Sequence, residues 1–303
     1  MATYNGEKYI AEQIDSLLKQ TYQDIKIYIL DDSSTDKTWQ IVCEYAERYP
    51  TKIFVQRQLR NTGNAKHNFF QLMKTIRDDY LMPCDQDDVW LPEKIEKTLR
   101  KMKEIEEAHG TDMPILVHTD FCTTDQMLNI LDSSARNSAK FNCNRTALHQ
   151  ILTQNVVAGS TAMYNRALAD LIYEEPNYCV MHDWWLALLA SALGTISYIN
   201  ESTVLHRLHE KNVSGGIAGS TILRKLYILT HRDIMVTRIS ELYLQAASLL
   251  EQYKEILSED KIALLEEYCS LPKHNKFKKW KIIFKLKCYH QDFYRDMIYL
   301  LFV

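Results

Sequence analysis

The chain has 303 residues, of which 46% are hydrophobic and 25% are charged, with a formal net charge of −3. These proportions are ordinary for a globular protein, and the net charge gives no indication of a nucleic-acid partner. The seven cysteines show no CxxC spacing, so we expect reduced thiols in a cytoplasmic protein, and neither a disulfide framework nor a zinc site. No run approaches the roughly 20 apolar residues that a membrane span needs.

Helix and strand signals alternate over the first hundred residues. Apolar residues at helical spacing predict a helix over 6–20, and the β-branched run 25–30 predicts a buried strand. The alternation then continues through helix 35–49, strand 52–56, helix 64–76, strand 79–84 and a helix that begins near Pro92. This order predicts an α/β fold with a mostly parallel sheet and helices on both of its faces.

Acidic residues follow two of the predicted strands. Asp31 and Asp32 end the run 25–30, and Asp85, Asp87 and Asp88 follow the strand 79–84. Ligands bind beyond the carboxyl ends of strands in such sheets, and carboxylates at a DxD spacing suit Mg²⁺ or Mn²⁺. The residues alone also allow structural roles instead of a ligand site. Asp31 and Asp32 could form a turn with Asx hydrogen bonds. The second group could be a solvated loop in which Asp88 caps the next helix. Neither GxGxxG nor GxxxxGK[ST] occurs, so dehydrogenase and P-loop interpretations lack a phosphate cradle.

The pattern becomes less regular after Pro114. Strand signals at 115–121 and 160–165 and a strand pair near 195–208 are separated by a polar segment and by the helices 146–154 and 183–193. From about residue 220 onward only helical signals remain. We therefore expect an α/β domain over 1–215 and a helical extension over 216–303.

Three segments near the start resemble the family 2 glycosyltransferases of GT-A fold: "ATYNGEKYIAEQIDSLLKQTY", "LDDSSTDKT" and "CDQDDVWLPEKIEK". The "DQDDVW" form resembles that of bacterial rhamnosyltransferases that build cell-wall or O-antigen polysaccharide. A weaker similarity continues through "NVVAGSTAMYNR", "MHDWW" and "HRLHEKNVSG". The resemblance implies a metal-dependent, inverting transfer of a sugar, L-rhamnose from dTDP-rhamnose, to a growing polysaccharide or a lipid-linked acceptor, with Mg²⁺ or Mn²⁺ as cofactor.

Two other functions stay open. One is a transferase of the same fold that uses a UDP-hexose, and the other is a shortened, non-catalytic protein that binds nucleotide-sugars or serves as a scaffold. The second arises because the family begins with an apolar strand of about six residues, whereas this chain opens at "MATYNG". We therefore expect the first strand to be missing from the sheet.

The resemblance also implies roles for individual residues. Thr3 and Tyr4 match positions that line the nucleotide base pocket, and Asp32 matches a carboxylate that binds the base or ribose. Asp85 is expected near the ribose or donor sugar, and Arg207 near the donor diphosphate.

Asp87 and His209 are the implied metal ligands, although a lone histidine is also common as a structural residue. Asn61 and Lys66 fall in a segment that either borders the donor site or forms a plain surface loop.

Asp183 matches the family's catalytic base, which takes the proton of the attacking acceptor hydroxyl. The residue before it is usually Glu, and here it is His182. The residues alone also allow Asp183 to cap the helix that follows. Trp184 and Trp185 could stack on a sugar or pack in the core.

The C-terminal segment 273–303 is strongly basic at its start. Seven lysines and no acidic residue lie between Lys273 and Lys287, with Phe277, Trp280 and Phe284 at helical spacing. Such a helix can lie on an anionic membrane surface, which suits a lipid-linked acceptor. The alternative is that the aromatic residues pack on the protein while the lysines face water. Nothing elsewhere in the chain supports nucleic-acid binding.

Overall fold

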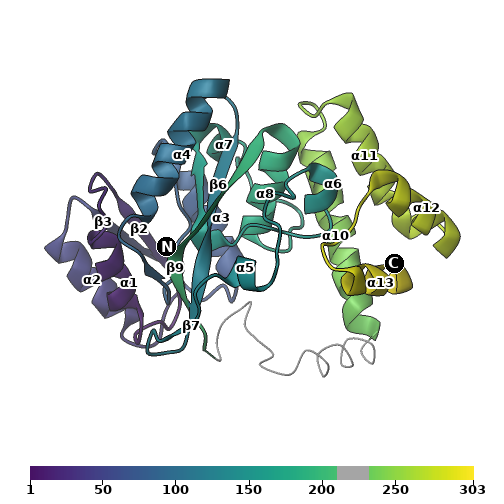
Figure 1. Ribbon diagram of the computed structural model, residues 1–303. Coiled ribbons are helices and arrows are strands. Elements are labelled where there is room, and N and C mark those ends of the chain that lie inside the picture. The colour runs from purple at the N-terminus through teal and green to yellow at the C-terminus, as the bar shows by residue number, and fades with distance from the viewer. Residues whose placement is uncertain (210–231) are drawn as a thin grey trace. The chain divides into compact units, whose positions relative to one another are not determined.

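The computed structural model describes residues 1–209 and 232–303 (Figure 1). Two compact units are formed, the first by 1–140, 157–175 and 196–209, and the second by 141–156, 176–195 and the residues from 210 to the C-terminus. The boundary predicted between 215 and 216 lies outside the described residues. All seven cysteines are free.

A parallel sheet of three strands carries the first acidic pair. It consists of β1 (Ala2–Thr3), β2 (Ile27–Asp31) and β3 (Ile53–Arg57), in the order β1-β2-β3. Helices α1 (Ile10–Leu18), α2 (Thr38–Arg48) and α3 (Ala65–Thr75) accompany it, with α2 packed against β3 and α3 against β1 and β2. The alternation of strands and helices predicted from the sequence is therefore confirmed for this part of the chain.

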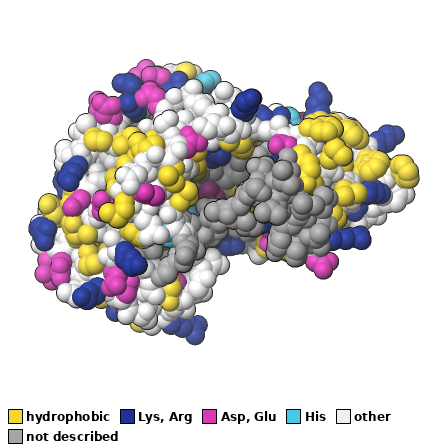
Figure 2. Space-filling view, turned by 60° about the horizontal axis from the view of Figure 1, so that its bottom comes forward, with side chains coloured by type: hydrophobic (Ala, Val, Ile, Leu, Met, Phe, Trp, Pro, Cys, Tyr) yellow, Lys and Arg dark blue, Asp and Glu magenta, His cyan; other side chains and the backbone are white. Residues whose placement is uncertain are grey.

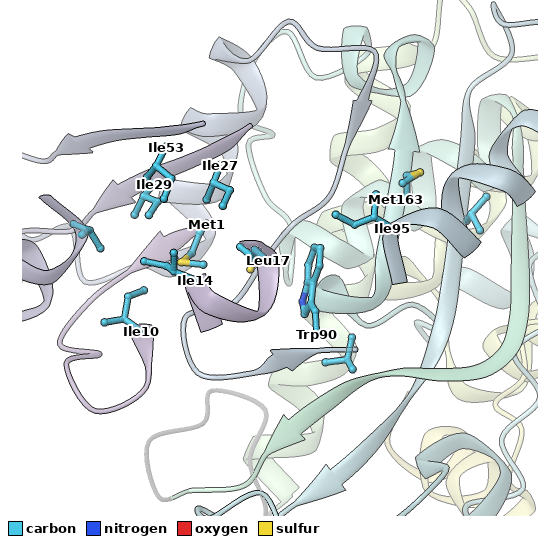
Figure 3. Packing of buried hydrophobic residues seen from close by; sticks show 14 of the residues in the cluster. Met1, Ile10, Ile14, Leu17, Ile27, Ile29, Ile53, Trp90, Ile95 and Met163 are labelled. Carbon is cyan, nitrogen blue, oxygen red and sulfur yellow. The ribbon is translucent and has the colours of Figure 1, made fainter. Parts of the chain in front are cut away.

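The first strand is present as two residues, so the expectation that it is missing is wrong. Ala2 pairs with Leu30 and Thr3 pairs with Asp31, both in parallel register. Met1 is buried in the same hydrophobic cluster as Ile14, Leu17 and Ile29 (Figure 3). This strand leads into the "TYN" segment.

The second sheet is largely antiparallel, which differs from the mostly parallel sheet that we expect from the sequence. Its strands are β4 (Tyr80–Leu81), β5 (Val89–Trp90), β6 (Ile115–Thr124), β7 (Ile130–Asp132), β8 (Ala162–Asn165) and β9 (Thr195–Arg207). The order is β4-β8-β6-β9-β5, with β7 beside β6, and the pairs β4–β8, β6–β8, β6–β7 and β5–β9 are antiparallel. Parallel pairs need long crossover connections, and the regular helical crossovers end near Pro114. Helices α4 (Lys94–His109), α5 (Ala135–Ser138) and α7 (Arg166–Asp170) belong to this unit.

The second unit is helical. It contains α6 (Leu148–Ile151), α8 (His182–Leu193), α10 (Arg232–Tyr253), α11 (Glu259–Cys269), α12 (Lys276–Leu286) and α13 (Phe293–Phe302). Helix α8 is apolar around most of its circumference and is almost entirely buried, and it packs against α6. Helix α10 packs against α11 and α13. Across the described part of the chain, none of the helices is both long enough and apolar enough to span a bilayer.

Candidate functional site

The loop after β1 is fixed to the acidic loop by an amide side chain. The backbone N–H of Tyr4 donates to Gln86 Oε1 at 2.9 Å, and Gln86 Nε2 donates to the carbonyl of Tyr4 at 3.0 Å. A Cβ on Gly6 would lie 2.3 Å from the Gln86 side chain, so glycine leaves the room that this side chain needs. Tyr4 remains 45% exposed. This arrangement presents an aromatic face next to the acidic loop.

Asp31 and Asp32 have different surroundings at the end of β2. Asp31 is fully buried and accepts hydrogen bonds from Thr3 Oγ1 (3.1 Å) and from the backbone N–H of Ser34 (2.9 Å), and it pairs with Arg57 at 3.3 Å. These bonds make Asp31 a structural residue, and they turn the Thr3 hydroxyl toward the protein interior.

Asp32 joins the end of β2 to the loop before α3. Its two carboxylate oxygens accept from the backbone N–H and the hydroxyl of Thr62, both at 2.9 Å. The side-chain amide of Asn61 donates to the Asp32 carbonyl at 3.0 Å. Asn61 therefore lies beside the predicted donor-binding residue Asp32, and Asn64, which caps α3 by accepting from the N–H of Lys66, ends the loop.

Asp87 and His209 are brought together by the antiparallel pairing of β5 with β9. The register pairs Val89 with Leu205 and Trp90 with Val204, so the residues before β5 meet those after β9. Nε2 of His209 lies 2.7 Å from Oδ2 of Asp87. The two predicted metal ligands are therefore in direct contact, with the ring of Tyr9 stacked on His209 at 5.2 Å.

Asp88 is buried behind this pair. Nδ1 of His206 lies 2.9 Å from Asp88 Oδ1, and the other carboxylate oxygen is buried without a hydrogen-bond partner among the described residues. Helix α4 begins after Glu93, so the suggested role of Asp88 as its cap is wrong. Burial, and then the charge of Asp88, raises the pKa of Asp87 above the ordinary value for aspartate. A cation at Asp87 would offset this accumulation of negative charge.

The contact with Asp88 also changes the pKa of the His206 side chain. Burial lowers its pKa, but the hydrogen bond with Asp88 and the charges of the neighbouring carboxylates outweigh burial, and the pKa is raised above its ordinary value. His206 in its charged form therefore partly neutralises the acidic loop from β9.

Arg207 holds the acidic loop from the interior. Its Nε donates to the carbonyl of Asp87 at 3.0 Å, Nη2 lies 2.5 Å from Glu12 Oε2, and Nη1 donates to the carbonyl of Gln126. Its guanidinium carbon also lies 4.6 Å from the centre of the Tyr9 ring. Arg207 is 2% exposed. These contacts are with the protein itself, and the predicted contact of Arg207 with the donor diphosphate stays a prediction.

The side chains around Asp87 that could act as metal ligands suit a divalent cation that is bound by only a few protein groups. Asp87 supplies a carboxylate and His209 an imidazole, and Asp85 lies partly exposed two positions earlier in the loop. Within residues 1–209 and 232–303, no group of three or more His, Cys, Asp and Glu side chains is arranged to hold a metal ion. Cations of this type complete their coordination with phosphate oxygens and water, so two protein ligands beside a diphosphate are sufficient.

Asp183 lies in the first turn of α8, in the second unit. Met181 is the N-cap residue, and Asp183 Oδ1 accepts from the backbone N–H of Trp184 at 2.7 Å. The carboxylate thus satisfies one N–H at the helix N-terminus, where the helix dipole favours its ionised form. Burial lowers the pKa of the preceding His182 to about 3, so this side chain is neutral.

Of the two tryptophans after Asp183, Trp185 packs in the core, whereas Trp184 is half-buried and its stacking on a sugar stays a prediction. Trp185 is fully buried with its ring 6.2 Å from that of Tyr253, and Trp184 Nε1 donates to the carbonyl of Ile151 at 2.7 Å. Lys211, which belongs to the "HRLHEKNVSG" segment, lies outside the described residues.

Several contributing residues are not evident from the sequence. Gln86 and His206 lie within motifs that we singled out, but the sequence alone assigns neither of them a role. Glu12 and Thr62 carry no such signal, because their roles depend on partners far away in the chain.

The arrangement of two sheets with acidic loops at strand ends defines the class of protein as an α/β protein of GT-A fold. The solved structure of TarS from S. aureus in complex with UDP-GlcNAc is similar to it with a TM-score of 0.56 and 18% identity, covering 94% of this chain and 71% of that chain. A mannosyltransferase from Pyrobaculum calidifontis in complex with GDP-Man and Mn²⁺ gives a TM-score of 0.53 at 16% identity, covering 95% and 83%.

The family model described as Glycosyl transferase family 2 matches residues 1–171, which is more than half of the chain. The chain therefore belongs to glycosyl transferase family 2 and is an enzyme of glycosyl transfer. Among curated relatives, the dTDP-rhamnosyl transferase RfbG of Shigella flexneri is 29% identical over 219 residues, which cover 71% of this chain and 73% of the relative.

Proposed function

We propose that this glycosyltransferase is metal-dependent and inverting, and that it transfers L-rhamnose from dTDP-rhamnose to a polysaccharide or lipid-linked acceptor. The observation that carries the metal and donor site is the direct contact of Asp87 with His209 beside the exposed ring of Tyr4. The similarity to a dTDP-rhamnosyl transferase supports the choice of sugar. A reaction of this kind is consistent with a cytoplasmic protein.

Each residue would contribute a different part of the chemistry. Tyr4 would stack on the base and Asp32 would bind the base or ribose, with Thr3 supporting this wall of the pocket. Asp85 would contact the ribose or the donor sugar. Asp87 and His209 would hold Mg²⁺ or Mn²⁺, which when bound neutralises charge on the leaving diphosphate.

The acceptor hydroxyl would attack the anomeric carbon as the bond to the diphosphate breaks. Asp183 would take the proton of that hydroxyl, which requires its carboxylate to be ionised. The N-terminal position of Asp183 in α8 favours that state. Because His182 next to it is neutral, it does not supply a proton to the Asp183 carboxylate in place of the acceptor hydroxyl.

A donor panel tests this function. Purified protein is incubated with dTDP-rhamnose, UDP-hexoses or GDP-mannose, with Mn²⁺, with Mg²⁺ or with EDTA, and release of the nucleoside diphosphate is measured. We expect release from dTDP-rhamnose that depends on the cation. Preference for a UDP-hexose would contradict the proposal that rhamnose is transferred, and activity in EDTA would contradict metal dependence. Binding of a nucleotide-sugar without any release would favour the scaffold alternative.

We also propose that the C-terminal helices bind an anionic membrane surface. Phe277 on α12 and Phe293 on α13 are 81% and 78% exposed, and Phe284 is 52% exposed. Figure 2 shows hydrophobic side chains beside Lys and Arg on the surface of the C-terminal part. Exposed aromatic rings next to lysines favour the headgroup region of a bilayer, and such a location would bring the enzyme to a lipid-linked acceptor.

Trp280 is less exposed than the two phenylalanines of α12. Its Nε1 donates to the carbonyl of Leu300 at 2.8 Å, so its ring is held against α13. Ile282 and Ile283 are buried in the same unit. Of the three aromatic residues at helical spacing, Phe277 and Phe284 are exposed and Trp280 is half-buried.

A further inference from the structure

The chain between α12 and α13 is bonded to the segment 141–156, which belongs to the same unit. Lys287 ends α12 in the left-handed conformation (φ 55°), which turns the chain away from the helix axis. The chain then runs to Asp292, the N-cap residue of α13. We call residues 287–292 the linker.

Gln291 of the linker is bonded to the segment on both sides of α6. The backbone N–H of Asn142 donates to Gln291 Oε1 at 2.5 Å, and Gln291 Nε2 donates to the carbonyl of Asn142 at 3.0 Å. The backbone N–H of Gln291 donates to Gln154 Oε1 at 2.9 Å. Since α6 lies between positions 142 and 154, this one residue fixes the chain before and after the helix.

The carbonyl of Tyr289 makes a second connection of this kind. It accepts from Nη2 of Arg145 at 2.7 Å and from the hydroxyl of Thr153 at 3.2 Å. Arg145 precedes α6 and Thr153 follows it. Because a helix of about one turn is not stable by itself, the position of α6 depends on contacts such as these.

Helix α6 in turn supports the start of α8, against which it packs (Figure 1). The carbonyl of Ile151, the last residue of α6, accepts from Nε1 of Trp184 at 2.7 Å. The backbone N–H of Trp184 donates to Asp183 Oδ1 at 2.7 Å. Trp184 therefore contacts α6 through its ring and the Asp183 carboxylate through its backbone.

We propose that Gln291 and Arg145 are positioning residues for sugar transfer. They hold α6, and through α6 and Trp184 they keep the Asp183 carboxylate in the orientation that takes the acceptor proton. This inference rests on the proposed role of Asp183 as the catalytic base. A base must lie within hydrogen-bond reach of the proton that it takes, and a displacement of about 1 Å can lower the rate by about a hundredfold.

The proposal predicts an effect on turnover and none on donor binding. Both positioning residues belong to the second unit, whereas the residues proposed to bind the donor belong to the first. Loss of the Gln291 or Arg145 contacts should therefore lower kcat and leave the donor KM unchanged.

The first experiment measures release of dTDP from dTDP-rhamnose with Mn²⁺, with water in place of the acceptor. Gln291→Ala and Arg145→Ala should each lower kcat by about fivefold or more, with the donor KM unchanged. Arg145→Lys keeps a donor for the Tyr289 carbonyl and should restore most of the rate. Arg295→Ala, at an exposed position of α13, is the control and should behave as the wild type. Unchanged kcat in Gln291→Ala, a rise in its donor KM alone, or an equal loss in Arg295→Ala would overturn the proposal.

A double-mutant cycle shows whether Gln291 acts through Asp183. In the Asp183→Asn background, Gln291→Ala should cause no further loss of rate, because the base is already absent. Losses that multiply would give Gln291 a separate role and contradict the proposal. Full turnover in Asp183→Asn alone would contradict the catalytic base itself, so the two failures are distinguishable.

Amide exchange at Trp184 gives a readout that does not depend on activity. Gln291→Ala should speed this exchange by about tenfold, since the start of α8 loses its support, whereas Arg295→Ala should leave it unchanged. Unchanged exchange at Trp184 would show that the linker does not hold the start of α8. Faster exchange throughout the second unit, with a large fall in melting temperature, would show that Gln291 only stabilises the fold and would also overturn the proposal.

Discussion

Nε2 of His209 lies 2.7 Å from Oδ2 of Asp87, although 122 positions separate the two residues in the chain. The contact depends on the pairing of β5 with β9 and combines a carboxylate with an imidazole at the end of a sheet. Carboxylate oxygen and imidazole nitrogen are both ligands that Mn²⁺ accepts.

Asp87→Ala should abolish cation-dependent binding of the nucleoside diphosphate, and His209→Ala should weaken it by roughly ten- to a hundredfold. Titration calorimetry with dTDP, with and without Mn²⁺, measures both. Asp112→Ala is the matched control, since Asp112 is exposed and distant in sequence from the acidic loop. If Mn²⁺ strengthens dTDP binding to Asp87→Ala as much as to the wild type, Asp87 is not a metal ligand.

Asp183→Asn removes a proton acceptor while keeping an oxygen that can accept from the N–H of Trp184. Sugar transfer should fall by a factor of about 10² or more, with the donor Kd and the melting temperature preserved. Steady-state rates and donor titrations on the same preparation check this. Full turnover in Asp183→Asn would mean that the carboxylate only supports the start of α8.

Arg207→Lys and Arg207→Ala test whether Arg207 holds the acidic loop. Loss of its bonds to the Asp87 and Gln126 carbonyls should lower the free energy of unfolding by about 1–3 kcal/mol, because lysine cannot reproduce the forked contacts. Urea denaturation measures this, and Glu12→Gln is the milder comparison. Unchanged stability together with much weaker dTDP binding would instead indicate direct contact of Arg207 with the donor.

His118 should make the first unit sensitive to acid. It is fully buried on β6, and both ring nitrogens are without hydrogen-bond partners among residues 1–209 and 232–303. Burial, with a smaller effect of Arg136, lowers its pKa from 6.5 to about 3. Below pH 6.5 the unfolded chain therefore binds a proton that the folded chain does not, and the stability present above pH 6.5 is lost as the pH falls.

The free energy of unfolding should fall by roughly 2 kcal/mol between pH 6.5 and pH 5. The substitution His118→Phe should remove most of this pH dependence. Chemical denaturation at a series of pH values gives the comparison. His109→Phe, at an exposed position, is the control. If the stability of His118→Phe has the same pH profile as that of the wild type, His118 does not cause the sensitivity to acid.

Phe277→Ser combined with Phe293→Ser should reduce binding to vesicles that contain phosphatidylserine, since two exposed rings are lost while the lysines remain. Co-sedimentation measures this, and added salt should release the wild type. Leu59→Ser is the control, because Leu59 is also fully exposed but lies in the first unit. Equal binding to neutral vesicles, or no effect of the double substitution, would contradict a membrane surface here.

The amino-acid sequence by itself determines the elements that depend on local pattern. The β-branched run before Asp31 and Asp32, the acidic loop from Asp85 to Asp88 and the apolar helix after Asp183 are all found where the periodicity predicts them. Each signal is contained within a few neighbouring residues, and strand ends in an α/β fold lead to the ligand site.

Only the tertiary structure decided which distant residues meet. The contacts of Asp87 with His209 and of Asp88 with His206 follow from strand register, which no local pattern specifies. The contact of Arg207 with Glu12 joins β9 to helix α1, which is also distant in the chain. The antiparallel second sheet is likewise a matter of which strands pair.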